Sequence, residues 1–110
     1  MNGRFIIHRA KNGEYHFDLH AGNGEIILSS QLYADRESVD IGIKSVRENA
    51  PRDERYERTL ACNDQPMFNL KAANHKVIGT SQRYSSVEAR DNGIASVKEH
   101  APDAKVVAHT

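Results

Sequence analysis

The stretch FDLHAGNGEIILSSQLYADRESVDIGIKSVRENAP, residues 17–51, decides the fold because the chain contains it twice. The second copy, residues 68–102, reads FNLKAANHKVIGTSQRYSSVEARDNGIASVKEHAP and aligns with the first without a gap. About half of the paired positions are identical, and the offset is the same at both ends of the match. A match at one fixed offset indicates a duplicated supersecondary unit. The repeat predicts architecture and says little about chemistry.

Each repeat begins with a pattern typical of strands. Residues 4–9 (RFIIHR) are short, apolar and β-branched, and residues 14–20 alternate apolar and polar side chains. Asn12-Gly13 between them predicts a type I′ hairpin turn. A second turn leads into residues 25–29, which completes a predicted three-stranded antiparallel meander. In the second repeat, Asn74 is expected to take the left-handed turn position.

A helix is predicted next, from about residue 35 to residue 49. Asp35 is the expected N-cap, and Ser85 with Glu88 matches a capping box in the second repeat. Gly42 lies on the apolar stripe of this helix and recurs as Gly93. Because an interior glycine weakens a helix by about 1 kcal/mol relative to alanine, its repetition indicates a close contact between helix and sheet.

The constant offset also makes Phe5, Tyr56 and Val107 equivalent, so two units contain three copies of one strand. The copy at 54–60 closes the first unit and opens the second. We therefore predict an α+β fold: a tandem duplication of a β-β-β-α-β unit. It forms one antiparallel sheet with two helices on one face and the C-terminal strands exchanged between the units. Since each half would have a marginal core alone, we expect a single domain over residues 1–110, with repeats at about 4–54 and 55–109.

Composition excludes several classes of protein. The 110 residues carry 15 Lys plus Arg and 15 Asp plus Glu, so there is no overall basic charge for nucleic acid or membrane surfaces. No signal peptide and no apolar run of membrane-spanning length is visible. The lone Cys62 has no internal disulfide partner, which favours a reducing, cytoplasmic setting.

The sequence resembles the YegP family of small bacterial proteins, whose domain of roughly fifty residues often occurs in tandem. The most specific stretches are 21–25 (AGNGE), 42–47 (GIKSVR), 69–75 (NLKAANH), 81–84 (SQRY) and 93–98 (GIASVK). The resemblance covers essentially the whole chain and implies a duplicated β(3)-α-β fold with exchanged C-terminal strands. It implies no cofactor and no site residues, because the family has no established biochemical function.

A metal site is the first hypothesis that the residues suggest. His16, Asp18 and His20 share one face of a strand, but His16 and His20 lie roughly 13 Å apart along it, too far to share one ion. The second repeat has Met67, Asn69 and Lys71 at these positions. We therefore predict no metal ligands here and interpret these side chains as a polar, solvated strand face.

The segments between strand and helix are the second candidate. Their shared pattern, hydroxyl-Gln-x-Tyr, consists of Ser30, Gln31 and Tyr33 in one repeat and Ser81, Gln82 and Tyr84 in the other. The following helix N-terminus offers free N–H groups, so these corners could hold an anion or a peptide. The structural interpretation is favoured: Ser and Gln satisfy the turn backbone, and Tyr packs over the helix start.

Basic side chains form the third candidate, since Lys71, Lys76 and Arg83 make the second repeat more basic than the first. With few aromatic residues for stacking, nucleic-acid binding is the alternative and not the preferred function. No nucleophile motif or phosphate loop is present. We therefore expect a small, monomeric, non-enzymatic module that binds a protein partner, with the open sheet face as the natural surface.

Overall fold

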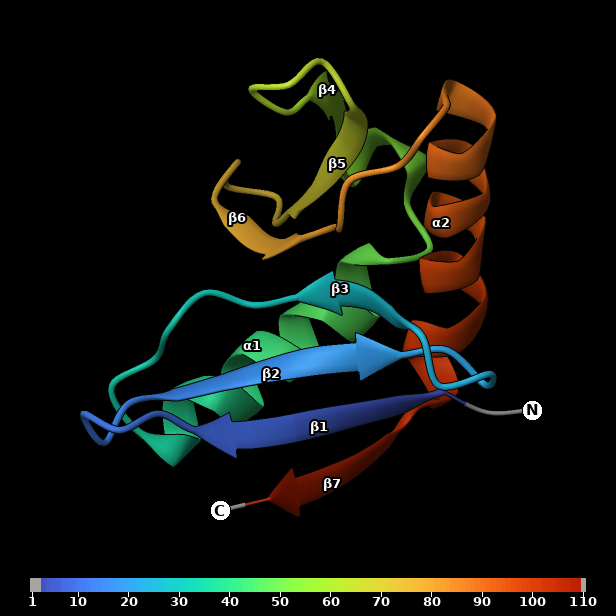
Figure 1. Ribbon diagram of the computed structural model, residues 1–110. Coiled ribbons are helices and arrows are strands. Elements are labelled where there is room, and N and C mark those ends of the chain that lie inside the picture. The colour runs from blue at the N-terminus through green and yellow to red at the C-terminus, as the bar shows by residue number, and fades with distance from the viewer. Residues whose placement is uncertain (1–2, 110) are drawn as a thin grey trace.

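The computed structural model describes residues 3–109, so residues 1, 2 and 110 of the predicted domain lie outside the described part. The chain forms two repeats, each with three strands followed by one helix (Figure 1). The first repeat contains β1 (Arg4–Arg9), β2 (Tyr15–His20), β3 (Ile26–Ser29) and α1 (Arg36–Asn49). After the short 3-10 helix η1 (Asp53–Arg55), the second repeat contains β4 (Tyr56–Leu60), β5 (Pro66–Lys71), β6 (Val77–Thr80), α2 (Val87–His100), η2 (Ala101–Asp103) and β7 (Lys105–His109).

The seven strands within residues 3–109 belong to one sheet, in the order β4-β5-β6-β3-β2-β1-β7. The repeats meet at the centre, where β3 pairs with β6 through Ser29 and Thr80. The strand after each helix pairs with the strands that precede the other helix: β4 follows α1 and pairs with β5, and β7 follows α2 and pairs with β1. Figure 1 shows β7 beside β1, although they lie at opposite ends of the chain. The predicted duplication and strand exchange are confirmed.

One strand pair departs from the predicted antiparallel sheet. β7 runs parallel to β1, whereas the other strand pairs are antiparallel. The reason lies where β7 begins, because the Lys105 N–H donates to the carbonyl of Gly3 at 3.3 Å. The chain therefore leaves η2 at the start of β1 and follows that strand in the same direction.

The hairpin turns are not the type I′ turns that Asn12-Gly13 predicted. Gly13 alone of the pair has positive φ, and its N–H donates to the Ala10 carbonyl at 3.0 Å. This is a β-turn followed by one left-handed residue, a common three-residue hairpin connection. In the fourth hairpin the left-handed residue is His75 and not Asn74, whose side-chain oxygen instead accepts from the Lys76 N–H.

Both helices begin at a side-chain cap. The Asp35 carboxylate accepts from the Ser38 N–H at 2.8 Å, which confirms the predicted N-cap. In the second repeat Ser86 is the cap and accepts from the Ala89 N–H at 3.0 Å. The predicted capping box of Ser85 and Glu88 is wrong, because Ser86 occupies the position equivalent to Asp35 and the third residue after it is Ala89.

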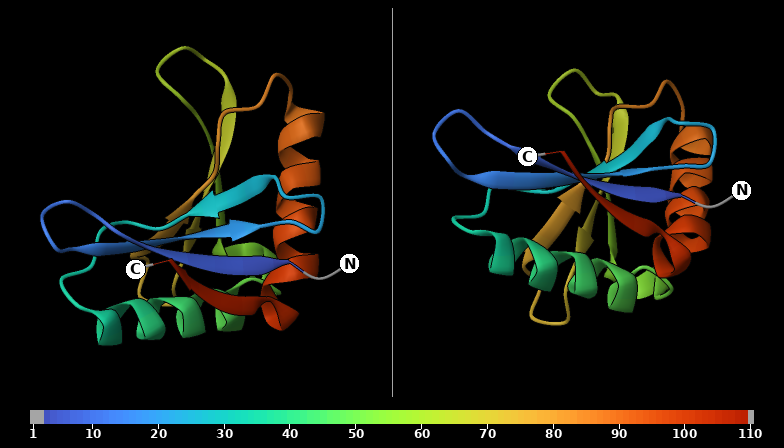
Figure 2. Two further views of the ribbon diagram at one scale, coloured as in Figure 1. Left: turned by 60° about the horizontal axis from the view of Figure 1, so that its bottom comes forward. Right: turned by 90° about the horizontal axis from the view of Figure 1, so that it is seen from below.

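The two helices lie against one side of the twisted sheet (Figure 2), and the buried apolar side chains form one hydrophobic core. It takes large side chains from both repeats, including Phe5, Phe17 and Phe68, each fully buried. Each helix contacts both halves of the sheet, α1 against β2 and β6 and α2 against β5 and β3. Within residues 3–109, neither helix is long and apolar enough to cross a membrane.

Candidate functional site

The two serines of the predicted corners are hydrogen-bonded to the backbone around them. The Ser30 hydroxyl accepts from the Phe17 N–H at 2.8 Å and donates to the Gln31 carbonyl at 2.8 Å. Ser81 does the same with Phe68 and Gln82, at 2.9 and 2.7 Å. Each hydroxyl therefore continues the hydrogen bonding of a buried strand where β3 or β6 has ended. Both hydroxyls are already engaged within the fold.

Tyr33 and Tyr84 pack against their own repeat. The ring of Tyr33 stacks on Phe17 with centroids 6.1 Å apart, and Tyr84 stacks on Phe68 at 6.3 Å. Their hydroxyls lie against the helix glycines, so the close contact predicted at Gly42 is with a tyrosine ring. Burial raises the pKa of both tyrosines, and the Gln two residues before each acts in the opposite direction.

The glutamine and the tyrosine of each corner line a cleft between the repeats. We call the first the α1 cleft, about 340 Å³ in volume; it is lined by Gln31, Tyr33, Ser38, Ile41, Gly42, Ser45, Ala72, Asn74, Lys76, Val77 and Ile78. The second, the α2 cleft, is about 160 Å³ and is lined by Ala21, Asn23, Glu25, Ile27, Gln82, Tyr84, Ala89, Asn92, Gly93 and Ser96. All residues of the α2 cleft have their repeat equivalents in the α1 cleft. The pseudo-twofold therefore builds the same cleft twice.

The two clefts differ in chemistry. Ile41 of the α1 cleft, 63% exposed, is replaced by Asn92 in the α2 cleft. Lys76 of the α1 cleft is replaced by Glu25. One cleft is thus apolar and basic at its rim, and the other is polar and acidic. Because both repeats fold with the same plan, folding does not require the apolar and basic version.

The α1 cleft continues into a wider concavity of about 560 Å³, which shares Ser45, Ala72 and Asn74 with it. This extension adds Arg52 and Arg55 to its lining, together with Glu48, Asn49 and Ala73. The repeat equivalents of the two arginines are Asp103 and Val106. We call the cleft and its extension the α1 groove. It is more basic than the corresponding surface along α2.

The three basic residues predicted as a nucleic-acid surface are not all brought together: Lys71 and Lys76 flank the turn between β5 and β6, and Arg83 lies apart from them. Lys71 ends β5, and its Nζ lies 2.9 Å from a carboxylate oxygen of Glu57. The pKa of the Glu57 carboxyl is lowered first by a hydrogen bond from Asn69 and then by the contact with Lys71. Lys76 lies in the adjoining turn and lines the α1 cleft. Arg83 follows the other end of β6 and directly precedes Tyr84. The Tyr84 N–H donates to the carbonyl of Pro66, at the start of β5. Arg83 therefore lies about a strand's length from Lys71.

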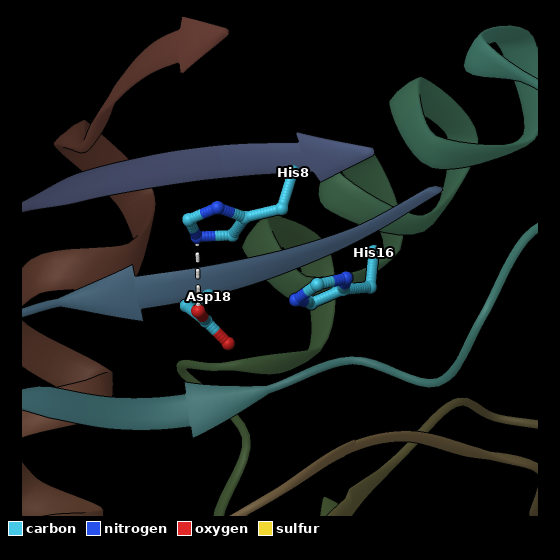
Figure 3. A group of neighbouring side chains, drawn as sticks. All are labelled: His8, His16 and Asp18. Atoms are coloured by element: carbon cyan, nitrogen blue, oxygen red, sulfur yellow. Dashed lines mark ion pairs between the residues drawn. The ribbon is translucent and has the colours of Figure 1, made fainter. Parts of the chain in front are cut away.

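On the open sheet face, the structure brings together a cluster that the sequence analysis missed. His8 on β1 lies directly opposite His16 on β2, and their rings stack with centroids 4.9 Å apart. Asp18 joins them through an Oδ2–His8 Nε2 distance of 3.2 Å (Figure 3). His20 is separate, with Nδ1 3.1 Å from the Gly24 carbonyl oxygen. The predicted solvated face is also wrong at Asp18, which is only 8% exposed.

The second repeat has a different arrangement on this face. Asn69, the equivalent of Asp18, donates to Glu57 at 3.0 Å and accepts from the Thr80 hydroxyl at 3.0 Å. Lys71 completes this network through Glu57.

The sequence could have revealed the His8 cluster through hairpin register, because a turn centred near residue 12 places residues 8 and 16 opposite one another.

This duplicated α+β fold, with its exchanged strands, defines a class of small tandem-repeat proteins. The chain belongs to the family described as Domain of unknown function (DUF1508), whose model matches residues 10–57 and again 61–107. It is 57% identical over 106 residues to a UPF0339 protein of Acinetobacter baylyi, covering 96% of each chain. It is 46% identical over 110 residues to the UPF0339 protein YegP of Escherichia coli K12, covering 100% of each.

Two solved structures share the fold. The solution structure of a UPF0339 protein from Shewanella oneidensis has a TM-score of 0.91 at 48% identity and covers 98% of this chain and 92% of that one. The solution structure of yegP from E. coli, described as a protein of unknown function, has a TM-score of 0.94 at 46% identity and covers 100% and 95%. These relatives agree with the predicted family, and none of their names states an enzymatic activity.

Proposed function

We propose that this protein is a non-enzymatic module that binds a protein partner in the α1 groove. The observation that carries the proposal is the asymmetry between two clefts built by the same repeat. What folding requires is present in both clefts, whereas an exposed isoleucine and a basic rim are present in only one. The two corners also share a concavity of about 320 Å³ at the β3–β6 junction, but its lining comes from both repeats alike and offers no such asymmetry.

The chemistry of the groove defines the partner segment. Ile41 and Val77, 63% and 36% exposed, offer apolar contact surface at the cleft. Lys76, Arg52 and Arg55 supply positive charge along the groove. Complementary charges of this kind mainly set specificity and association rate, while apolar burial supplies affinity. The partner is therefore a protein segment that combines an apolar side chain with nearby carboxylates.

The test exchanges the two clefts' residues. Ile41→Asn with Lys76→Glu gives the α1 cleft the residues that the α2 cleft already carries, so the variant should fold. Proteins captured from a cell extract by the unmodified chain are expected to be lost with this variant. The matched control, Asn92→Ile with Glu25→Lys, alters the α2 cleft and should retain them. Capture of the same proteins by both variants would reject the α1 groove.

Nucleic-acid binding through the more basic second repeat is the alternative. It predicts that short RNA or DNA binds with strong salt dependence and is weakened by charge reversal at Lys71, Lys76 and Arg83. The groove proposal predicts that only Lys76 of these three affects binding of the protein partner. The two proposals therefore differ at Lys71 and Arg83.

We propose a cytoplasmic setting, in keeping with the exposed, unpaired thiol of Cys62.

A further inference from the structure

A second site lies on the opposite side of the sheet from the helices and is independent of the α1 groove. The antiparallel register of β1 and β2 places His8 opposite His16, with Asp18 next on the same face of β2. One ligand atom from each of these three side chains lies within 4.8 Å of the other two. In Figure 3 the two imidazole rings and the carboxylate gather on one patch of the sheet.

We propose that His8, His16 and Asp18 bind a divalent transition-metal ion of the zinc type. Two imidazole nitrogens and one carboxylate oxygen form a donor set that suits Zn²⁺ and its first-row neighbours. Mg²⁺ and Ca²⁺ prefer sites made of oxygen atoms. With three ligands from the chain, the remaining coordination position is left to water or to a donor from another molecule.

The observed spacing is close to what such an ion needs. Donor atoms that each lie about 2 Å from a tetrahedral ion are roughly 3.3 Å apart. His8 Nε2 and Asp18 Oδ2 are already 3.2 Å apart. The other separations, at most 4.8 Å, must shorten by no more than about 1.5 Å. Rotation of side chains can supply this movement, since His8 is 38% exposed at its side chain.

The repeat again provides the comparison that separates function from folding. At the equivalent positions the second repeat has Thr59, Met67 and Asn69, which together cannot form this donor set. That half of the sheet nevertheless forms the same strands in the same register. The fold therefore does not require His8, His16 or Asp18. In addition, His16 Nδ1 is buried and makes no hydrogen bond within residues 3–109.

The test titrates the isotope-labelled full-length protein with Zn²⁺, followed by amide NMR and calorimetry. We expect saturable binding of one ion, with shifts centred on β1 and β2 and no such response to Mg²⁺. The variants His8→Thr, His16→Met and Asp18→Asn each install the residue of the second repeat. Each should weaken Zn²⁺ binding by about tenfold or more, since even supporting partners of a metal ligand are worth 10- to 100-fold.

Two controls locate the ion. His20→Gln alters a histidine on the same strand face outside the cluster, and Cys62→Ser removes the single thiol. Both should bind Zn²⁺ as the unmodified chain does. Absence of saturable binding by the unmodified chain would overturn the proposal. Unchanged affinity in the three cluster variants, or loss of binding in either control, would overturn it as well. Because Asp18→Asn is nearly isosteric, it keeps the test decisive if another variant folds poorly.

Discussion

The hydroxyl of Tyr33 lies where a side chain on Gly42 would have to be. A Cβ added to Gly42 would be 2.5 Å from Tyr33 Oη and 2.8 Å from Cζ, and Gly93 stands in the same relation to Tyr84. Both distances are shorter than van der Waals contact, and the stacked tyrosine ring cannot move away without disturbing Phe17. Glycine is therefore needed at this position to leave room for the tyrosine hydroxyl, although it weakens the helix.

We expect Gly42→Ala and Gly93→Ala each to lower the free energy of unfolding by about 1–3 kcal/mol, the usual cost of overpacking. Alanine by itself would strengthen the helix by about 1 kcal/mol, and we expect the clash with the tyrosine to outweigh this gain. Urea denaturation followed by circular dichroism would measure both. Asp40→Ala, at an exposed position on α1, is the control and should change stability by less than about 0.5 kcal/mol. Stabilisation by Gly42→Ala would contradict the packing described.

Removal of the corner hydroxyls should destabilise each repeat. Ser30→Ala leaves the buried Phe17 N–H without its acceptor, and Ser81→Ala does the same to Phe68. An unsatisfied buried donor costs about 1–3 kcal/mol. Thermal or urea unfolding should show a similar loss for both variants and almost none for Ser85→Ala. If both corner variants were as stable as the unmodified protein, the hydroxyls would not be structural.

Acid should weaken a contact between η1 and α2. Asp53 accepts hydrogen bonds from Lys98 at 2.8 Å and from Arg58 at 2.9 Å, which lower its pKa to about 2. Since the folded pKa lies below the unfolded value near 4, its stabilising effect is present above about pH 4 and is lost as the pH falls toward 2. The stability difference between the unmodified chain and Asp53→Asn should therefore shrink over this range in urea titrations. A difference that is constant from pH 6 to pH 2 would rule out this linkage.

The two repeats already complete the pseudo-twofold arrangement, so we expect a monomer in solution. The strand that follows each helix finds its partner within the same chain, β4 on β5 and β7 on β1. Sedimentation equilibrium should give the mass of one chain, 12.3 kDa. A stable dimer would mean that another surface self-associates. Such a dimer would also call for a search at the exposed edges of β4 and β7.

Much of the fold could be predicted from the sequence because its determinants are local and occur twice. Apolar periodicity, turn residues and Asp35 identify strands and helices, and the offset of the repeat identifies the exchanged strands. The parallel β1–β7 pair could not be predicted in this way, because it depends on η2 lying beside Gly3. The cap at Ser86 could have been, since the repeat aligns this residue with Asp35.

The candidate sites were less accessible from sequence. Within β2 alone His16 and His20 lie too far apart to share an ion, and the partner of His16 is instead His8 on the neighbouring strand. The α1 groove combines Ile41 of one repeat with Lys76 of the other, which no single stretch of sequence brings together. Its asymmetry became visible once equivalent residues could be compared in equivalent clefts.

The most direct test of the α1 groove places a photo-crosslinking amino acid, p-benzoylphenylalanine, at position 41 in one protein and at position 92 in another. These positions are equivalent in the two repeats and lie on equivalent clefts, so general surface exposure is matched. Irradiation in cells should yield a discrete adduct with a partner protein from position 41 and none from position 92. Equal adducts from both positions, or none from position 41, would contradict the proposal that the α1 groove binds the partner.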